Sequence, residues 1–386
     1  MVSFALILCL VSLLWWGELA VEWWVASGSG TDLADLPPGT DVNGLSVIIP
    51  ARNEEKNIET ALKSLLSALP PRSEAILVND RSTDRTLAIA DRLKKTDARL
   101  KVIDIKSVTE GWLGKTHAMQ AGYCMAGGDY LLFTDADVIF KPGCLSKAVN
   151  FCRTAGVDHL VATPRMITCG FWERVFVSFF SISLVSRFRL WRASISGSRF
   201  YAGIGAFNLV SRKAYEKAGT HRAVRSEVVD DLQLGRLLKS AGAKQVVVAG
   251  ERCLQVRWNE GLGGLIAGLE KNAYAGFDYS PLLTIAGLTS VLAGTLLPAA
   301  LPMVFLIYPA PGLIFPALAG SGVWLSFLVL YGLGGRGTGA HWLYFLTFPL
   351  GAVLLTWAIL RSMVYFHLRG GVKWRGTVYR NPRSKI

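Results

Sequence analysis

Asp135 and Asp137 are the residues in this sequence best placed to do chemistry. They follow residues 130–133, an apolar YLLF segment typical of a buried strand. Carboxylates at positions i and i+2 project to the same side of a strand, so both can face one ligand where the strand ends. Two hard oxygen donors suit Mg²⁺ or Mn²⁺, ions that keep bound water and share their other positions with phosphates. The alternative is an ordinary surface turn, in which Asp is common.

Lys115 lies in a glycine-flanked turn, residues 111–116 (GWLGKT), that looks at first like a Walker A loop. That motif requires GxxxxGK[ST], and Thr109 occupies the position of its first glycine. We therefore reject a P-loop ATPase. A lysine on such a turn can still neutralise a phosphate, so Lys115 is a candidate contact for a diphosphate.

A second pair of carboxylates, Asp230 and Asp231, lies near the start of a helix predicted over residues 226–240. Transfer of a group onto a hydroxyl needs a base to take its proton, and either carboxylate could act as that base. The alternative is capping, because carboxylates in a first turn interact favourably with the helix dipole. The sequence contains no HExxH motif and no GxSxG elbow that would favour a competing chemistry. We interpret the five scattered histidines as structural.

The elements that must position these groups alternate along the chain. Strands are predicted at residues 45–50, 75–78, 100–105 and 130–133, with helices at 53–66, 83–95 and 117–126 between them. This alternation predicts an α/β fold with a parallel sheet, and such sheets bind ligands at the carboxyl ends of their strands. Asn53, which we expect to cap the first helix, and Glu54 follow the first strand, and Asp80 and Ser82 follow the second. The cluster suits a nucleotide-diphosphate donor, with Asp80 on the base or ribose and a cation on the diphosphate.

Residues 45–260 also resemble the family 2 glycosyltransferases of GT-A fold. The resemblance rests on a series of motifs in order: SVIIPARNEEKNIETALKSLL, VNDRSTDRT, GKTHAMQAG, FTDADV, GIGAFNLVSRKAYEKAG and VDDLQLGRLLKSAG. It implies that Pro50, Arg52, Glu54 and Asp80 line the nucleotide pocket. It also implies that Asp135 and Asp137 form the metal-binding DxD pair, with Asp137 the firmer ligand. Asp231 would be the general base and Asp230 its supporting acid, although the family pattern has Glu rather than Asp at position 230.

Two further comparisons with motifs of the family indicate which of its branches the chain resembles. Processive polysaccharide synthases of this family carry QxxRW. Here Arg257 and Trp258 are present, but Leu254 occupies the glutamine position and Gln255 is one residue late. This argues for an inverting enzyme that transfers a single sugar. The segments FWERV, YSPLL and GGVKWRGTVY resemble the membrane-bound branch associated with hopanoid biosynthesis and carotenoid glycosylation.

The chain is too apolar for an ordinary soluble enzyme: 51% of its 386 residues are hydrophobic and the mean hydropathy is +0.36. We predict a transmembrane anchor (1–25), a linker (26–44), a GT-A catalytic domain (45–280), membrane helices (281–366) and a basic tail (367–386). No Lys or Arg precedes Arg52, which favours a retained anchor over a cleaved signal peptide. Residues 171–192 have an apolar middle too short to span a bilayer, so they form an interfacial helix or a buried core helix.

Three apolar blocks follow the catalytic domain, at residues 282–308, 312–334 and 341–366. An even number of crossings is needed if the domain and the basic tail both face the cytosol. One block must then be re-entrant or interfacial, and the prolines of the first make it our candidate.

The net charge of +13 does not indicate nucleic-acid binding, because the basic residues are not arranged in a recognised binding motif. Many flank apolar segments, where they would attract anionic lipid. They include Arg187, Arg189, Arg192, Arg369, Lys373, Arg375, Arg380, Arg383 and Lys385. We expect an integral protein of a bacterial inner or plasma membrane, with the catalytic domain in the cytoplasm and its six cysteines reduced.

These observations lead to one expected function and two alternatives. We expect transfer of one sugar from a nucleotide-diphosphate donor to a membrane lipid, such as an isoprenoid, hopanoid, carotenoid-like lipid or glycerolipid, assisted by Mg²⁺ or Mn²⁺. A processive polysaccharide synthase would instead make a ladder of products. A non-enzymatic membrane scaffold would retain only a degenerate transferase domain.

Overall fold

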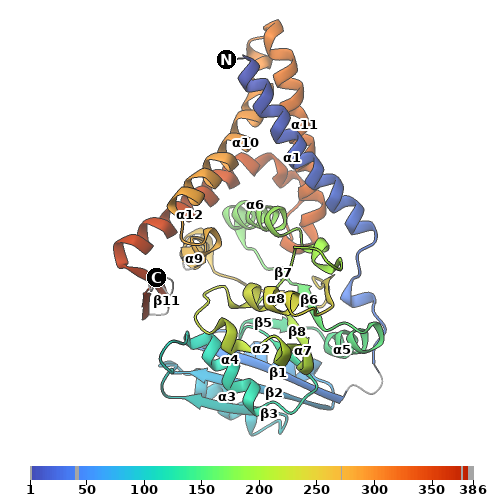
Figure 1. The fold of residues 1–386 in the computed structure, drawn as a ribbon, viewed down its shortest axis with the longest axis vertical. Helices are drawn as coiled ribbons and strands as arrows, with labels where there is room; N and C mark the ends of the chain where they lie inside the picture. The colour runs from blue at the N-terminus through green and yellow to red at the C-terminus, as the bar shows by residue number, and fades with distance from the viewer. Residues whose placement is uncertain (1, 40–42, 271, 375–376, 381–386) are drawn as a thin grey trace. The chain divides into compact units, whose positions relative to one another are not determined.

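The computed structural model describes residues 2–39, 43–270, 272–374 and 377–380, which divide into two compact units (Figure 1). One comprises Met1–Ser29, Ile167–Arg187 and Asn259–Ile386, and the other comprises Gly30–Met166 and Phe188–Trp258. We call them the helical unit and the sheet unit. This division differs from the predicted domain of residues 45–280, because residues 167–187 and 259–280 fall in the helical unit.

The sheet unit is built on seven strands in the order β3-β2-β1-β4-β8-β6-β9. They are β1 (Asn43–Ala51), β2 (Arg72–Asp80), β3 (Leu100–Ile105), β4 (Tyr130–Phe133), β6 (His159–Thr163), β8 (Asn208–Ser211) and β9 (Gln245–Ala249). The first four in the chain are parallel, as predicted. The complete sheet is mixed, because β8, which lies beyond the predicted strands, runs antiparallel to both β4 and β6. A second sheet contains β5 (Val138–Phe140), β10 (Leu254–Val256) and β7 (Arg165–Met166).

Helices cover both faces of the seven-stranded sheet. One face packs against α2 (Ile58–Ala68), α3 (Thr86–Lys94) and α5 (Cys144–Ala155). The other packs against α4 (Gly114–Met125), α7 (Arg212–Lys217) and α8 (Asp230–Ser240). Successive residues of β1 alternate between the two apolar cores, with Val47 and Ile49 on one side and Ile48 on the other. This alternation explains why the central strands are apolar throughout.

Asn53 does not cap the first helix, so that prediction is wrong. Helix α2 begins at Ile58, and Asn53 has a φ of 54°, in the left-handed region that Asn tolerates. The Asn53 side chain instead accepts a hydrogen bond from the Thr83 amide at 2.8 Å. It therefore joins the loops that follow β1 and β2.

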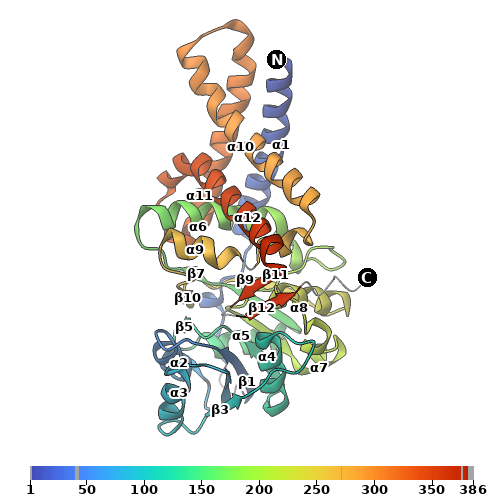
Figure 2. The ribbon, with the colours of Figure 1, turned by 90° about the vertical axis from the view of Figure 1, so that its left-hand side faces the viewer.

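The helical unit contains α1 (Val2–Gly28), α6 (Gly170–Phe188), α9 (Gly261–Glu270), α10 (Pro281–Ile307), α11 (Ile314–Thr338) and α12 (Phe348–Arg369). Figure 2 shows it turned by 90°. Short 3₁₀ helices lie before α10, α11 and α12: η4 (Ala275–Phe277), η5 (Pro311–Leu313) and η6 (Trp342–Thr347). A final hairpin pairs β11 (Gly371–Trp374) with β12 (Thr377–Arg380). Four segments of the described chain are long and apolar enough to cross a membrane: Val2–Gly28, Pro281–Ile307, Pro311–Thr338 and Trp342–Arg369.

The first apolar block is not irregular in the structure. Helix α10 is continuous over 27 residues, with Pro298 and Pro302 inside it. A Cβ on Gly320 of α11 would lie 2.5 Å from the Pro298 carbonyl oxygen, so glycine at that position lets the two helices approach closely. Packing against α11 holds the proline-containing stretch in helical form, as neighbouring helices commonly do in membranes.

Helix α6 covers most of the predicted 171–192 segment, and its middle is buried. Val175, Phe176 and Phe179 are fully enclosed, and a Cβ on Gly351 of α12 would lie 2.5 Å from the Phe179 Cβ. A location at the bilayer surface stays a prediction. Of the predicted basic tail, Arg375, Arg383 and Lys385 lie outside the described residues.

Candidate active site

The loops after β1 and β2 form a single hydrogen-bonded rim at the carboxyl edge of the sheet. The Asn53 amide donates to Ser82 Oγ at 3.0 Å, and the Glu54 amide donates to Thr86 Oγ1 at 2.8 Å. Together with the Asn53–Thr83 bond, these contacts fix the backbone on either side of Arg52 and Asp80. The role that the structure supports for Ser82 is to brace this rim.

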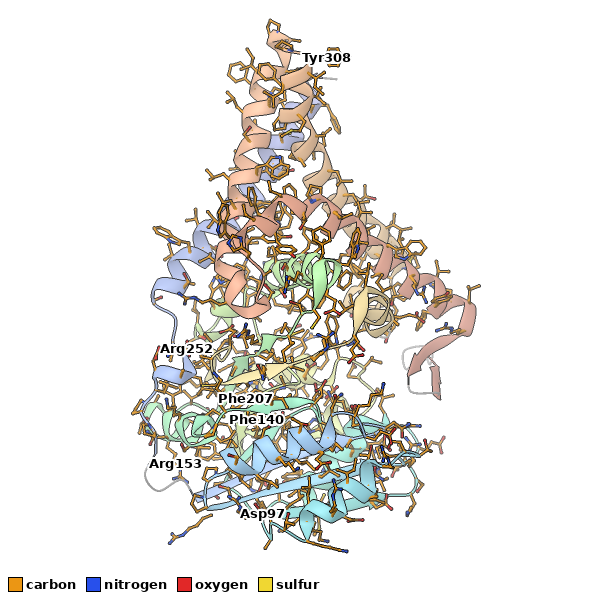
Figure 3. All side chains as sticks on the ribbon, turned by 180° about the vertical axis from the view of Figure 1, so that it is seen from behind. Asp97, Phe140, Arg153, Phe207, Arg252 and Tyr308 are labelled. Carbon is orange, nitrogen blue, oxygen red and sulfur yellow. The ribbon has the colours of Figure 1, made fainter. Side chains whose placement is uncertain are left out.

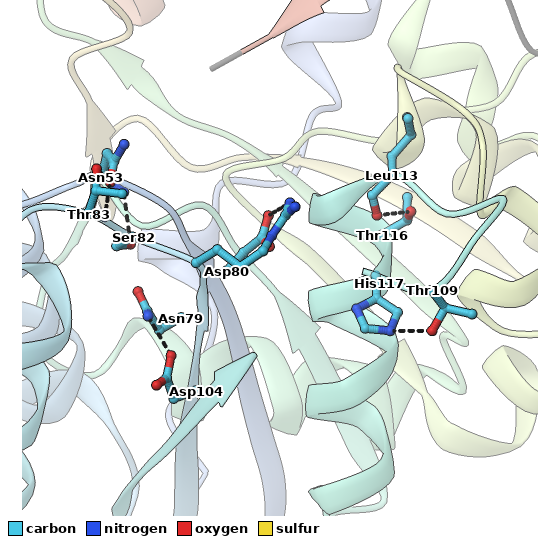
Figure 4. A network of polar contacts seen from close by, with 11 residues as sticks. Asn53, Asn79, Asp80, Ser82, Thr83, Asp104, Thr109, Leu113, Thr116 and His117 are labelled. Atoms are coloured by element: carbon cyan, nitrogen blue, oxygen red, sulfur yellow. Dashed lines mark hydrogen bonds and ion pairs between the residues drawn. The ribbon is translucent and has the colours of Figure 1, made fainter. Parts of the chain in front are cut away.

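Asp80 is buried at the end of β2, with 2% of its surface exposed. Arg81, which has a left-handed φ of 53°, donates from Nε to Asp80 Oδ1 at 2.8 Å. Figure 4 shows Asp80 between the rim and the start of α4. A Cβ on Gly114 would lie 2.2 Å from Asp80 Oδ2, so glycine there is needed for α4 to begin so close to the carboxylate. Neither Arg81 nor Gly114 was among the site residues predicted from the sequence.

Arg52 follows β1, whose residue Pro50 pairs in register with Val78 of β2. Its Nε and Nη1 atoms are buried and have no hydrogen-bond partner among the described residues. A buried guanidinium nitrogen without an acceptor is costly, and an anionic ligand would satisfy it. This observation fits the predicted position of Arg52 in a nucleotide pocket.

Lys115 connects the two predicted carboxylate pairs. Its Nζ atom lies 2.9 Å from Asp135 Oδ1 and 3.5 Å from Asp230 Oδ1. Burial alone would disfavour the ammonium, but the negative charges of Asp135, Asp230 and Asp231 hold the Lys115 pKa above its usual value. The structure therefore brings Lys115 together with two carboxylates, Asp135 and Asp230, that lie about 20 and about 115 positions further along the sequence.

Asp137 lies in a site that disfavours its charge. Burial raises its pKa from 3.8 to about 7, and the charges of Asp135 and Glu54 add to the effect. Crowded carboxylates of this kind favour a bound cation, and their hard oxygens suit Mn²⁺ or Mg²⁺. Within the described residues, no group of three or more His, Cys, Asp or Glu side chains could hold a metal unaided. Asp135 and Asp137 could therefore hold a divalent ion only with donors from water or a ligand.

Asp231 stands beside this cluster at the start of α8. Burial raises its pKa, the charge of Lys115 opposes that effect, and the charge of Asp135 adds to it. Its Oδ1 atom accepts a hydrogen bond from the Leu232 amide at 2.8 Å, which orients the carboxylate. A raised pKa suits a carboxylate that must accept a proton near neutral pH. Asp230, 4% exposed, points instead toward Lys115.

Two glycines before β8 allow the backbone to pack against the carboxylates. A Cβ on Gly205 would lie 2.5 Å from Asp135 Oδ2, and one on Gly203 would lie 1.9 Å from the Asp231 carbonyl oxygen. The Asp135 amide donates to the Gly205 carbonyl at 3.0 Å. The motif GIGAF was the signal in the sequence, but which carboxylates it contacts depends on β8 lying beside β4.

The turn that carries Lys115 is attached to the segment before α8. The carbonyl oxygen of Arg225 accepts from the Leu113 amide at 2.9 Å and from Thr116 Oγ1 at 2.7 Å. These bonds hold the start of α4 beside the start of α8, and thereby hold Lys115 near Asp230.

Residues 46–219 match the sequence profile described as Glycosyl transferase family 2. The match covers most of the sheet unit and helix α6. A 4,4'-diaponeurosporenoate glycosyltransferase from Staphylococcus aureus (strain USA300) is 29% identical over 236 residues, which are 60% of this chain and 61% of that protein. The protein of the same name from strain MRSA252 matches with the same identity and coverage. The match thus spans about three fifths of the length of these curated relatives.

A solved structure of mannosyltransferase PcManGT from Pyrobaculum calidifontis, in complex with GDP-Man and Mn²⁺, is similar with a TM-score of 0.58. The match covers 93% of this chain and 99% of the other at 16% identity. This likeness confirms the predicted fold, an α/β GT-A domain accompanied by apolar helices.

Proposed function

We propose that this protein transfers a single sugar, with inversion, from a nucleotide-diphosphate donor to a membrane lipid. The observation that carries the proposal is the contact of Lys115 with both Asp135 and Asp230 in a family 2 domain. It places a candidate phosphate contact beside a candidate cation site and beside the neighbour of the candidate base, Asp231, whose charge also acts on Lys115.

The donor would bind at the rim of the sheet. Buried Asp80 would accept hydrogen bonds from the base or ribose, and the unsatisfied nitrogens of Arg52 would donate to an anionic group of the donor. Lys115 would neutralise the diphosphate. Pro50, Glu54 and Ser82 would contribute by shaping the pocket wall and bracing its loops.

Asp135 and Asp137 would hold a divalent cation, Mg²⁺ or Mn²⁺, together with oxygens of the diphosphate. Such a cation supplies Lewis-acid stabilisation of the leaving diphosphate. The relief of charge repulsion at Asp137 favours this arrangement, because the carboxyl would then be ionised without an unpaired buried charge.

Asp231 would act as general base on the acceptor hydroxyl. Its raised pKa makes it a stronger base than an exposed aspartate. Asp230 would orient Lys115 and share its charge. Attack by the deprotonated oxygen on the face of the sugar opposite the diphosphate forms the new glycosidic bond and gives inversion.

The acceptor class is supported by the relatives and by composition. The curated relatives are named for 4,4'-diaponeurosporenoate, and the chain has apolar helices that fit a membrane. An isoprenoid or carotenoid-like lipid is therefore the first acceptor to test, ahead of a hopanoid or glycerolipid. We place the catalytic domain on the cytoplasmic side of a bacterial inner membrane, where nucleotide sugars are made.

The test is a donor screen in membranes that contain the full-length protein. Release of GDP or UDP from a panel of nucleotide sugars would be measured first, and mass spectrometry would then identify the lipid product. A single added hexose on a lipid is the expected result. A ladder of oligosaccharides would indicate a processive synthase, and no release from any donor with any lipid extract would support a scaffold.

A further inference from the structure

The last apolar segment differs from the other three in where its charges fall. In α12 the first thirteen residues, from Phe348 to Leu360, are uncharged, and Arg361 follows them. Thirteen helical residues extend only about 20 Å, whereas the hydrocarbon core of a bilayer is about 30 Å thick. The preceding η6 must therefore supply the remaining length if this segment crosses the membrane.

The contacts of η6 and Phe348 show that η6 does not extend α12 in one direction. The Phe348 ring stacks on Phe327 of α11 with centroids 4.0 Å apart, and it also contacts Trp324 at 4.8 Å. Phe327 precedes the end of α11 at Thr338 by eleven residues, or roughly 16 Å of helix. The chain leaves α11, runs back along it through η6, and starts α12 near the middle of α11.

The far end of α12 lies beside the start of α10. Arg361 and Arg369 both pair with Glu270 of α9, and the Tyr274 amide donates to Ser362 Oγ at 3.1 Å. Phe366 stacks on Tyr279, two residues before α10 begins, with centroids 4.8 Å apart. Helix α12 thus runs from the middle of α11 to the beginning of α10.

The packing of α1, α10 and α11 shows which ends of these helices lie on the same side as α12. Trp324 of α11 donates to the Ala299 carbonyl of α10, and the two helices are joined through the turn at Tyr308, so the start of α10 and the end of α11 lie on one side (Figure 3). Helix α1 runs parallel to α11. A Cβ on Gly312 would lie near Val2, and one on Gly334 would lie near Trp23. The end of α1 is therefore on that same side. Figures 1 and 2 show α12 beside the ends of α10 and α11 that lie away from their connecting turn.

One face of α12 is apolar and uncovered along its length. Val353, Trp357, Val364 and Leu368 are 45–75% exposed, and their spacing places them on a single helix face. The opposite face, which includes Gly351, Leu355, Ala358 and Ser362, is buried in the helical unit. An exposed apolar face next to arginines is the pattern of a helix that lies at the lipid–water boundary.

We infer that η6 and α12 form a re-entrant hairpin in one leaflet, that the exposed face of α12 contacts lipid, and that the chain crosses the membrane only at α1, α10 and α11. The basic tail then lies on the same side of the membrane as the sheet unit, because two of the four connections to that unit, at Ser29 and Asn259, leave from the end of α1 and from the segment before α10. Between the sheet unit and the tail the chain then crosses the membrane twice, at α10 and α11. An even number of crossings is required if the sheet unit and the basic tail both face the cytosol.

The test is labelling of single cysteines with a membrane-impermeant maleimide in sealed vesicles of both orientations. Cys124 and Cys169 are the exposed native cysteines of the described chain, and Cys124 reports on the sheet unit when Cys169 is replaced by serine. In a Cys124→Ser, Cys169→Ser background, Ser384→Cys would report on the tail and Tyr308→Cys on the α10–α11 turn. Tyr308 is 70% exposed.

We expect the Ser384→Cys variant to be labelled from the same face as Cys124, and the Tyr308→Cys variant from the opposite face only. Labelling of the Ser384→Cys variant from the Tyr308 face would overturn the inference, because α12 would then be a fourth crossing. A fusion of green fluorescent protein or alkaline phosphatase to the C-terminus gives an independent readout that needs no cysteine replacement. Equal reporter behaviour of this fusion and of one placed in the α10–α11 turn would also overturn it.

Discussion

Lys115 Nζ lies 2.9 Å from Asp135 Oδ1, so an ammonium occupies one carboxylate of the pair that we propose as the cation site. Lys115 is also 3.5 Å from Asp230, and it therefore balances carboxylates on both sides. A divalent ion that binds Asp135 must compete with this contact. Asp137 makes no ion pair with Lys115 among the described contacts, so a divalent ion would not have to displace the ammonium from it. Its role as the firmer ligand stays a prediction.

Replacing Lys115 by Met should separate cation binding from catalysis. Removal of the competing ammonium should strengthen Mn²⁺ binding without donor by about tenfold, since one opposing charge near the site is lost. Binding of the nucleotide-sugar donor and turnover should both weaken. Electron paramagnetic resonance of free Mn²⁺ and donor titration would measure the two effects. Lys115→Arg keeps the charge and is the matched control; weaker Mn²⁺ binding by the Met variant would contradict the proposed competition.

Asp137→Ala should abolish metal-dependent transfer while the protein still inserts and folds. The variant removes the ligand with the greatest unfavourable crowding, so its folded state should not be destabilised. Activity of the native protein should disappear in EDTA and return with Mn²⁺ or Mg²⁺, measured as nucleotide release. Full activity of the native protein in EDTA would remove the cation from the mechanism.

Asp231→Asn should lower turnover by about 100-fold or more with little change in donor affinity, because a base contributes about that much. Asn keeps the size of the side chain and can still accept the Leu232 hydrogen bond. Turnover and donor affinity would be measured on the same preparation. The exposed Asp91 offers a matched control as Asp91→Asn. Native turnover in the Asp231 variant would show that another group takes the proton.

Gly205→Ala should displace Asp135, because the added Cβ would lie 2.5 Å from its Oδ2 atom. A shift of this size at a reacting site can cost about 100-fold in rate. Gly127→Ala is the control, since its Cβ would meet Glu74 at an ordinary 3.5 Å. Both variants would be compared by melting temperature and by nucleotide release. Equal activities would mean that the position of Asp135 does not limit the reaction.

His159 should make the folded state sensitive to mild acid. It is buried between Asn208 and Gln245, and burial lowers its pKa to about 4. The unfolded chain takes up a proton near pH 6.5 whereas the folded chain does not. The free energy of unfolding should therefore fall, by up to about 3 kcal/mol, as pH decreases from 6.5 to 4. Melting curves of His159→Gln should show a smaller decrease than the native protein or His341→Gln, whose histidine is exposed.

Local patterns in the sequence were sufficient for the first half of the sheet. The strands around Ile48, Leu77 and Leu132 and the helices between them alternate regularly, so their order, their parallel pairing and the position of Asp80 and Asp135 at the strand ends could be predicted. The start of α2 could not, because Asn53 is a good helix cap by type and its side chain instead bonds to Thr83, about thirty positions away.

The arrangement of the site depended on contacts between distant segments. Gly114 and Gly205 matter because they let the backbone approach Asp80 and Asp135 closely, and Arg81 matters because it donates a hydrogen bond to Asp80. The GIGAF motif marked Gly205 in the sequence, but not the carboxylate that it contacts. Likewise, the hydropathy of the last apolar block matches that of the two before it, so our inference that it turns back depends on contacts such as the stacking of Phe348 on Phe327.

By itself, the sequence determined the chemistry available to this protein: two carboxylate pairs, a lysine on a glycine-flanked turn, and apolar segments for a membrane. Residue types and short-range spacing specify these features, because strands and helices have fixed periodicities. Only the tertiary structure decided which groups meet. Antiparallel insertion of β8 beside β4 brings Gly205 against Asp135, and the bonds from Arg225 to the start of α4 bring Lys115 to Asp230. Such pairings depend on packing across the whole domain, which no local pattern records.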